Sequence, residues 1–256
     1  MEKGLSRNTL KVIAIVTIII GHFFLYTLAT FRGFGLDRTL KMILMSVCFV
    51  GPPIFMFFIS EGFRYTSSKK RYALRLLVFA LITQAAHSVT AKGGLGFEGF
   101  FLDWNVILAL LLGFLDLCVI ESEQKPAVKV LGILALLSVG YFTRCEWGVF
   151  GQLMIMSFHL MRGKKAAKFL TVSVLMILSF VLGDIFAFGG SFQLMWLTAL
   201  SWMDIAFGIL GTDLVCFFYH GKNGRKSKFI QYSFYTLYPL HLLVIVAVNL
   251  IFGKAA

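Results

Sequence analysis

The chain of 256 residues is far more apolar and far less charged than a water-soluble domain. Hydrophobic residues make up 59% of it and charged residues 14%, and the mean hydropathy is +0.85. A soluble domain carries about 25% charged residues and roughly 45–50% apolar ones. This composition excludes a soluble enzyme, a secreted disulfide scaffold and a nucleic-acid-binding domain, and it predicts an integral membrane protein.

Apolar runs along the chain predict nine membrane-spanning helices, because a helix of about 20 apolar residues crosses the hydrocarbon core. The expected spans are 10–30, 41–63, 72–90, 102–120, 127–143, 147–161, 167–188, 195–219 and 229–252. The run 147–161 is short, and 191–219 is long enough to contain a half-helix before its span. The expected fold is therefore all-α, a polytopic membrane bundle that forms one domain over residues 1–256.

Lys and Arg are unevenly distributed over the predicted loops, and cytoplasmic loops are the ones that accumulate them. With the N-terminus inside, the inner segments hold eighteen of the 24 basic residues. The net charge of +12 is then explained by topology, with the C-terminus outside and no nucleic-acid partner. The four cysteines show no paired spacing, so neither a disulfide nor a metal site is expected.

Polar side chains inside the spans are candidate functional residues, because burying them in lipid is costly. His22, Gln84 and His241 each lie 12 residues beyond the start of their predicted spans. That places all three about 18 Å above the cytoplasmic ends of those spans. His87 lies one turn above Gln84, and for this residue we favour a packed structural role over a functional one.

A second cluster of polar residues lies at the cytoplasmic end of the second span and the start of the third. It contains Glu61, Arg64, Arg71 and Arg75. Glu61 is expected to pair with Arg64 or Arg75, which would lower the cost of burying both charges. The remaining cations suit phosphate groups. The alternative is that the cluster only marks the cytoplasmic side or contacts anionic lipid.

Several motifs resemble known membrane acyltransferases. Lys11 and His22 are separated by ten residues, which resembles the basic-residue and histidine pattern of the acyltransferase 3 class. The chain resembles the TraX family, known for acetylating F-type pilin, more closely. The segments that carry this resemblance are Leu10 to Ile15, Pro53 to Phe63, Arg71 to Leu77 and Phe234 to His241. The resemblance covers most of the chain and is weak between residues 120 and 220.

The resemblance implies a membrane-bound O- or N-acetyltransferase of a bacterial cytoplasmic membrane. Acetyl-CoA would be the donor, and the acceptor would be a peptide amine, a glycan or a lipid headgroup. An imidazole titrates near neutral pH, so His22 would act as general base, with direct transfer and an acyl-histidine intermediate both open. The expected oxyanion donors are His241, Tyr238 and Gln84, and the expected acyl-CoA-binding residues are Lys11, Glu61, Arg64, Arg71 and Arg75.

The chain departs from the family pattern at one position. Family members have Asp immediately before the first-span histidine, whereas this chain has Gly21. If that carboxylate orients the imidazole, the chain must use another one, and Asp103 and Asp184 are the candidates.

Two other classes of protein share some of these features. A small transporter would place polar residues at the midplane and could hinge at Gly51-Pro52-Pro53 in the second span. A membrane haem protein could ligate iron through His22 and His241, although the sequence lacks a haem or metal motif.

Overall fold

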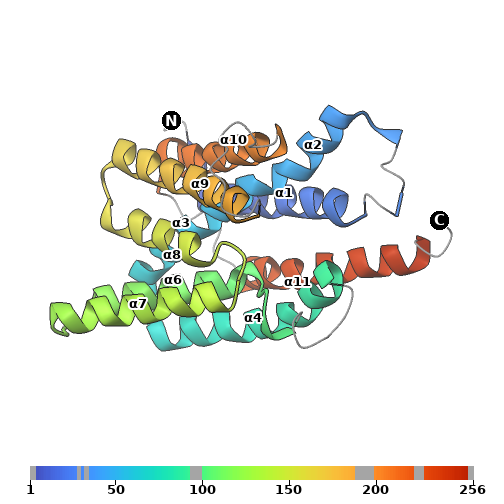
Figure 1. Cartoon of the computed structure of the whole chain (residues 1–256). Coiled ribbons are helices and arrows are strands. Elements are labelled where there is room, and N and C mark those ends of the chain that lie inside the picture. The colour runs from blue at the N-terminus through green and yellow to red at the C-terminus, as the bar shows by residue number, and fades with distance from the viewer. Residues whose placement is uncertain are drawn as a thin grey trace. The chain divides into compact units, whose positions relative to one another are not determined.

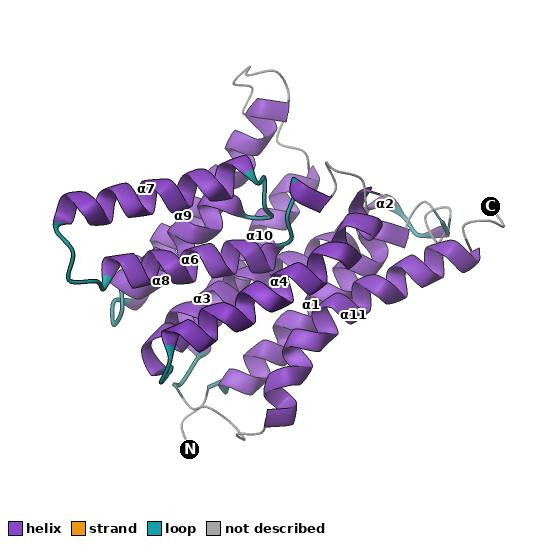
Figure 2. Cartoon of the chain, turned by 90° about the horizontal axis from the view of Figure 1, so that it is seen from below, coloured by secondary structure: helices purple, strands orange, loops and turns teal. Residues whose placement is uncertain are grey.

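The computed structural model of the chain describes residues 4–27, 30–31, 35–92, 100–187, 199–221 and 228–252 (Figure 1). Regular structure in these ranges is helical (Figure 2), apart from an isolated bridge between Leu5 and Tyr219. The all-α class predicted from the sequence is confirmed.

Nine helical segments of the described residues lie where the nine spans are predicted. They are α1 (Arg7–Thr27), the continuous α2–η2–α3 (Arg38–Ser46, Val47–Val50, Gly51–Tyr65), α4 (Lys69–Lys92), α6 (Val106–Ile120), α7 (Pro126–Phe142), α8 (Gly148–Leu160), α9 (Lys165–Ala187), α10 (Ala199–Asp213) with the π-helical η4 (Leu214–Phe218), and α11 (Lys228–Phe252). Six of these described segments are long and apolar enough to cross a membrane, whereas α6, α7 and α8 are shorter apolar helices of 15, 17 and 13 residues. The chain is a multi-pass membrane protein, and the expected half-helix at 191–198 lies outside the described residues.

The chain forms two compact units, residues 1–54 with 164–256, and residues 55–163. In the first unit α1 packs against α2, η2 and α11, and α10 packs against α9, α2 and η2. In the second unit α6 packs against α4, α7 and α8. Ten of the fifteen residues of α6 are buried, so this helix forms the centre of its unit.

The helix α6 starts later than the sequence predicts. The expected span begins at residue 102, whereas the helix begins at Val106. The reason is Asn105, whose side-chain oxygen accepts the backbone N–H of Ile107 and so caps the helix. With 15 residues, α6 is about 22 Å long.

A buried carboxyl–amide contact joins the three central helices of the second unit. Asp116 on α6 and Gln152 on α8 are both fully buried. With the amide oriented to satisfy its neighbours, the Gln152 nitrogen donates to Asp116 Oδ2 at 2.8 Å and to the Leu136 carbonyl of α7 at 3.2 Å. Such contacts hold helices together where water cannot compete.

Gly21 allows a close approach of α1 to the α2–η2 segment. A Cβ atom at this position would lie 2.5 Å from Cys48 Cβ and 2.8 Å from the Met45 carbonyl oxygen. Only a residue without a side chain fits here while the two backbones keep this distance. The close packing therefore explains why this chain has glycine next to His22.

We predict that Gly21→Ala destabilises the folded protein, because the added methyl group overlaps with backbone atoms of the neighbouring segment. Overpacking of this kind costs about 1–3 kcal/mol. Thermal unfolding of purified protein in lipid nanodiscs measures the effect.

Gly183→Ala is the matched control, because a Cβ at this helical position meets no atom of the described residues within 4 Å. That variant should unfold at the wild-type temperature or slightly above it, since alanine favours helix over glycine. Equal stabilities of the two variants would contradict the close approach at Gly21.

Candidate functional site

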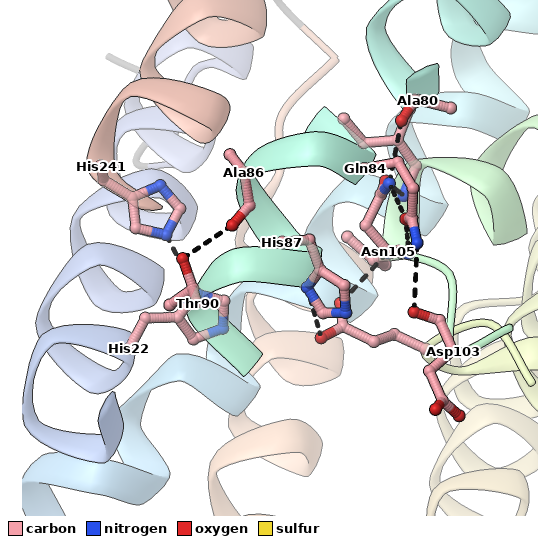
Figure 3. Close-up of polar contacts among 12 residues, drawn as sticks. His22, Ala80, Gln84, Ala86, His87, Thr90, Asp103, Asn105 and His241 are labelled. Carbon is pink, nitrogen blue, oxygen red and sulfur yellow. Dashed lines mark hydrogen bonds and ion pairs between the residues drawn. The ribbon is translucent and has the colours of Figure 1, made fainter. Parts of the chain in front are cut away.

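Two histidines from α1 and α11 form a direct hydrogen bond. His22 Nδ1 and His241 Nε2 lie 3.0 Å apart, and Figure 3 labels the two side chains, which come from neighbouring helices. His241 is buried and His22 half-buried. The common depth inferred from the sequence brings these two residues together, because α1 packs directly against α11.

The hydrogen bonds assign a proton to each ring. His241 Nδ1 lies 3.2 Å from the Leu237 carbonyl oxygen, which can only accept. His241 Nδ1 therefore carries the proton and Nε2 is an acceptor. It follows that His22 donates through Nδ1, and that the basic lone pair of a neutral His22 is on Nε2.

Two tyrosine rings border the histidine pair. The Tyr26 ring lies 5.6 Å from His22 at an interplanar angle of 69°. The Tyr238 ring lies 6.3 Å from His22 and 5.1 Å from His241, at 71° and 73°. Tyr238 is buried and meets both imidazoles edge-on. It therefore lies beside the predicted base, and its expected role as an oxyanion donor stays a prediction.

The hydrogen bond described at Nδ1 of His22 is to an imidazole, whereas the family pattern suggests a carboxylate. Asp103 forms an ion pair with Arg144, with 3.1 Å between Oδ1 and Nε. The side chain of Asp184 lies outside the described part of the structure. The hydrogen bond between the two imidazoles holds the His22 ring in a defined orientation.

Lys11 occupies the same helix as His22, eleven residues earlier. Eleven residues make three turns, so the two side chains share one face of α1 and lie about 16 Å apart along it. Lys11 is half-buried in the second turn of α1, four residues after Arg7 at the start of the helix. The ten-residue gap in the motif therefore places Lys11 and His22 on the same face of α1.

Gln84 contacts the start of α6 with both ends of its amide. Its oxygen accepts the Asn105 backbone N–H at 3.0 Å and the Asn105 side-chain N–H at 2.8 Å. Its nitrogen donates to the Phe100 and Asp103 carbonyls at 3.2 and 3.5 Å, and Figure 3 shows the network around Asn105. These contacts connect α4 to the cap of α6, and the oxyanion role expected for Gln84 stays a prediction.

His87 lies in the same unit as Gln84 and faces Glu146. The His87 Nδ1 atom is 3.8 Å from Glu146 Oε1, and the other carboxylate oxygen accepts the Val106 N–H at 3.1 Å. The histidine side chain is 6% exposed. This arrangement agrees with the packed role that the sequence favours for His87.

The predicted cluster at the start of α4 is positively charged in the structure. Arg64 and Arg71 are exposed, and Arg75 is half-buried with its guanidinium 5.2 Å from the Tyr72 ring. Within the described residues Arg75 Nε has no hydrogen-bond partner. The expected ion pair is wrong: among the described side chains Glu61 makes no salt bridge with Arg64 or Arg75, so it does not neutralise the cluster.

Sequence reasoning missed two polar residues that act on these sites, Asn105 and Asn249. Asn249 contacts Tyr26 and Thr30 at the far end of α1. Asn105 stands directly before an apolar run, the usual position of a cap. Asn249 follows His241 by eight residues, a spacing that keeps both on one broad helix face. Both signals are present in the sequence.

We predict that Gln84→Leu lowers stability, because it leaves two buried donors of Asn105 without their acceptor. The expected loss is about 1–3 kcal/mol, measured by thermal unfolding in nanodiscs. Ser138→Ala, which removes an exposed hydroxyl that in the described part of the chain bonds only the carbonyl four residues earlier, should leave the unfolding temperature unchanged. A Gln84→Leu variant as stable as wild type would show that the amide does not support α6.

A family model described as TraX protein matches residues 6–249. The chain is 29% identical over 252 residues to a protein of Dichelobacter nodosus described as probable fimbrial assembly protein FimC, serogroup H1. This match covers 94% of each chain. No solved structure matches the chain.

Proposed function

Because this chain belongs to the TraX family, we propose that it is a membrane-embedded acetyltransferase that moves the acetyl group of acetyl-CoA to an amine or hydroxyl acceptor. The observation that carries the proposal is the His22–His241 hydrogen bond. It gives His22 a fixed orientation and a basic Nε2 atom inside an apolar bundle. An oriented imidazole is the usual general base for acyl transfer.

In the proposed reaction His22 Nε2 removes the proton from the acceptor nitrogen or oxygen. The nucleophile forms a bond to the thioester carbonyl carbon, and the carbon–sulfur bond then breaks. The thiolate of CoA takes the proton back from His22, so protons balance over the cycle. His241 accepts from the other nitrogen of His22 throughout and stabilises the imidazolium that forms.

The developing oxyanion needs a hydrogen-bond donor close to the base. Tyr238 is the candidate in the unit that holds His22, because its ring borders both imidazoles. The amide of Gln84 is engaged with Asn105 and the neighbouring carbonyls. We therefore assign Gln84 a supporting role in α4–α6 packing and propose Tyr238 as the donor.

The phosphates of acetyl-CoA are proposed to bind the arginines at the α3–α4 turn. Arg64 and Arg71 are exposed there, and the guanidinium Nε of Arg75 is available for a hydrogen bond within the described residues. Guanidinium groups bind phosphate through paired hydrogen bonds. Lys11 adds a cation on the face of α1 that carries His22.

The acceptor is proposed to be a peptide amine, a glycan or a lipid headgroup. The relative from Dichelobacter nodosus is described as a probable fimbrial assembly protein, which makes a fimbrial subunit the first acceptor to test. The enzyme would lie in a bacterial cytoplasmic membrane with the N-terminus inside and the C-terminus outside, because the basic loops then face the cytoplasm.

We predict that His22→Ala abolishes acetyl transfer by the folded protein. Removal of a general base costs about 10²–10⁴-fold in rate. The assay measures free thiol released from acetyl-CoA by protein in nanodiscs, with a peptide amine, a glycan or a lipid as added acceptor. His159→Gln is the matched control, because His159 pairs with Glu121 at 2.8 Å in the other unit.

Wild-type rates in the His22→Ala variant would remove His22 as the base. Vectorial uptake of a solute into vesicles, without thiol release for any acceptor, would replace the transferase by a transporter.

We predict that Arg64→Ala and Arg71→Ala raise the KM for acetyl-CoA with a smaller change in kcat, because phosphate contacts serve binding. Each lost contact between charged groups is worth about 1.5–3 kcal/mol, which corresponds to roughly a tenfold to hundredfold change in KM. Lys125→Ala, an exposed cation in the α6–α7 turn, is the control and should leave KM unchanged. An equal effect of all three variants would indicate general charge attraction.

A further inference from the structure

A second polar contact joins α1 and α11 beyond the histidine pair. The Asn249 side-chain nitrogen donates to the Tyr26 carbonyl at 3.0 Å, and its oxygen accepts the Thr30 hydroxyl at 2.6 Å. One amide thus binds the last turn of α1 with its donor and the residues after it with its acceptor. We refer to the contacts among Tyr26, Thr30 and Asn249 as the amide staple.

The staple and the histidine pair fix the same alignment of the two helices. His22 and His241 are 219 residues apart in the chain, and so are Thr30 and Asn249. Both members of the second contact follow the first by eight residues, so α1 and α11 run parallel with one register. Phe31 and Phe252, whose ring centroids are 5.7 Å apart, continue this contact.

The hydrogen bond between the histidines depends on that register. One residue of sliding along a helix moves its side chains by about 1.5 Å. A hydrogen bond tolerates only about 2.7–3.2 Å between its heavy atoms. A slide of one residue would therefore break the 3.0 Å contact between the rings and release His22 from its orientation.

The segment of α11 before His241 is poorly suited to hold the register by itself. Pro239 lies inside the helix, two residues before His241. It supplies no backbone N–H to the carbonyl four residues earlier, and its ring loosens the preceding turn. The alignment of His241 with His22 therefore needs a fixed point on the other side of the histidine, which is where Asn249 lies.

We propose that Asn249 and Thr30 are positioning residues that hold His22 and His241 in hydrogen-bonding register. Tyr26 contributes only its backbone carbonyl to the staple, and the side chains of Thr30 and Asn249 act through the setting of α11 against α1. Its effect on the imidazoles stands independently of the reaction, whereas its kinetic consequence rests on the proposed acetyltransferase function.

The decisive experiment compares Thr30→Val with Thr30→Ser in protein labelled with ¹⁵N-histidine and held in nanodiscs. Valine has the shape of threonine without the hydroxyl, and serine keeps the hydroxyl. Thr30→Val should lose the ¹⁵N and ¹H signature of a hydrogen-bonded His22 Nδ1–H, and Thr30→Ser should retain it. Thr17→Val is the control on α1, because in the described structure this hydroxyl donates to the Ile13 and Ala14 carbonyls of its own helix.

Asn249→Leu gives a second test and should change the imidazole signals in the same way as Thr30→Val. Thermal unfolding of every variant shows whether it is folded; if Asn249→Leu does not fold, the two Thr30 variants decide the question. A folded Thr30→Val variant with wild-type imidazole signals would overturn the proposal.

Measuring kcat and KM for acetyl-CoA distinguishes a failure of the staple's positioning role from a failure of the proposed acetyltransferase function. Loss of orientation by about 1 Å costs as much as a hundredfold in rate, so Thr30→Val should lower kcat roughly tenfold to hundredfold. The KM for acetyl-CoA should stay near the wild-type value. If wild-type protein transfers no acetyl group, the proposed function fails while the imidazole signals still test the staple. Unchanged kcat in Thr30→Val with altered imidazole signals would contradict the link between register and catalysis.

Discussion

Polar groups inside a hydrocarbon layer must find partners within the protein, because water is absent there. The described polar contacts of this chain follow that constraint. Asp116 bonds Gln152, Gln84 bonds Asn105, and His22 bonds His241. Each contact joins different helices, so the few polar side chains in a chain with 14% charged residues determine how the helices are aligned. Apolar packing fills the space between these contacts.

The polar contacts differ in whether they leave a basic atom that could take up a proton. In the second unit the amides of Gln84 and Asn105 bond each other and the surrounding carbonyls, which makes that network structural. In the first unit His22 Nδ1 donates to His241 Nε2, and His241 Nδ1 donates to the Leu237 carbonyl. The nitrogen at the other end, His22 Nε2, is therefore basic. The histidine pair leaves one nitrogen of His22 as a candidate base. The amides of Gln84 and Asn105 use their donors and acceptors on each other and on backbone groups, so they support the helices.

The sequence contains enough information to predict the helices, because apolar runs and basic loops are local signals. It also predicts that His22 and His241 share a level, since both lie 12 residues into their spans. It does not predict partners. Gln84 has the same depth, yet the cap at Asn105 engages its amide. Glu61 is close in sequence to Arg64, yet it forms no ion pair with it in the described structure. Side-chain direction depends on which helix is adjacent, and that is a long-range property.

The pairing of α1 with α11 has a consequence for how the protein is made. His22 is synthesised 219 residues before His241, and the intervening helices enter the membrane first. Until α11 inserts beside α1, the first helix has neither the imidazole nor the amide that fixes it. The proposed base would thus be assembled late in biosynthesis, after most of the bundle has already formed around its place. A chain interrupted before α11 would lack His241 and therefore the hydrogen-bond partner of the proposed base.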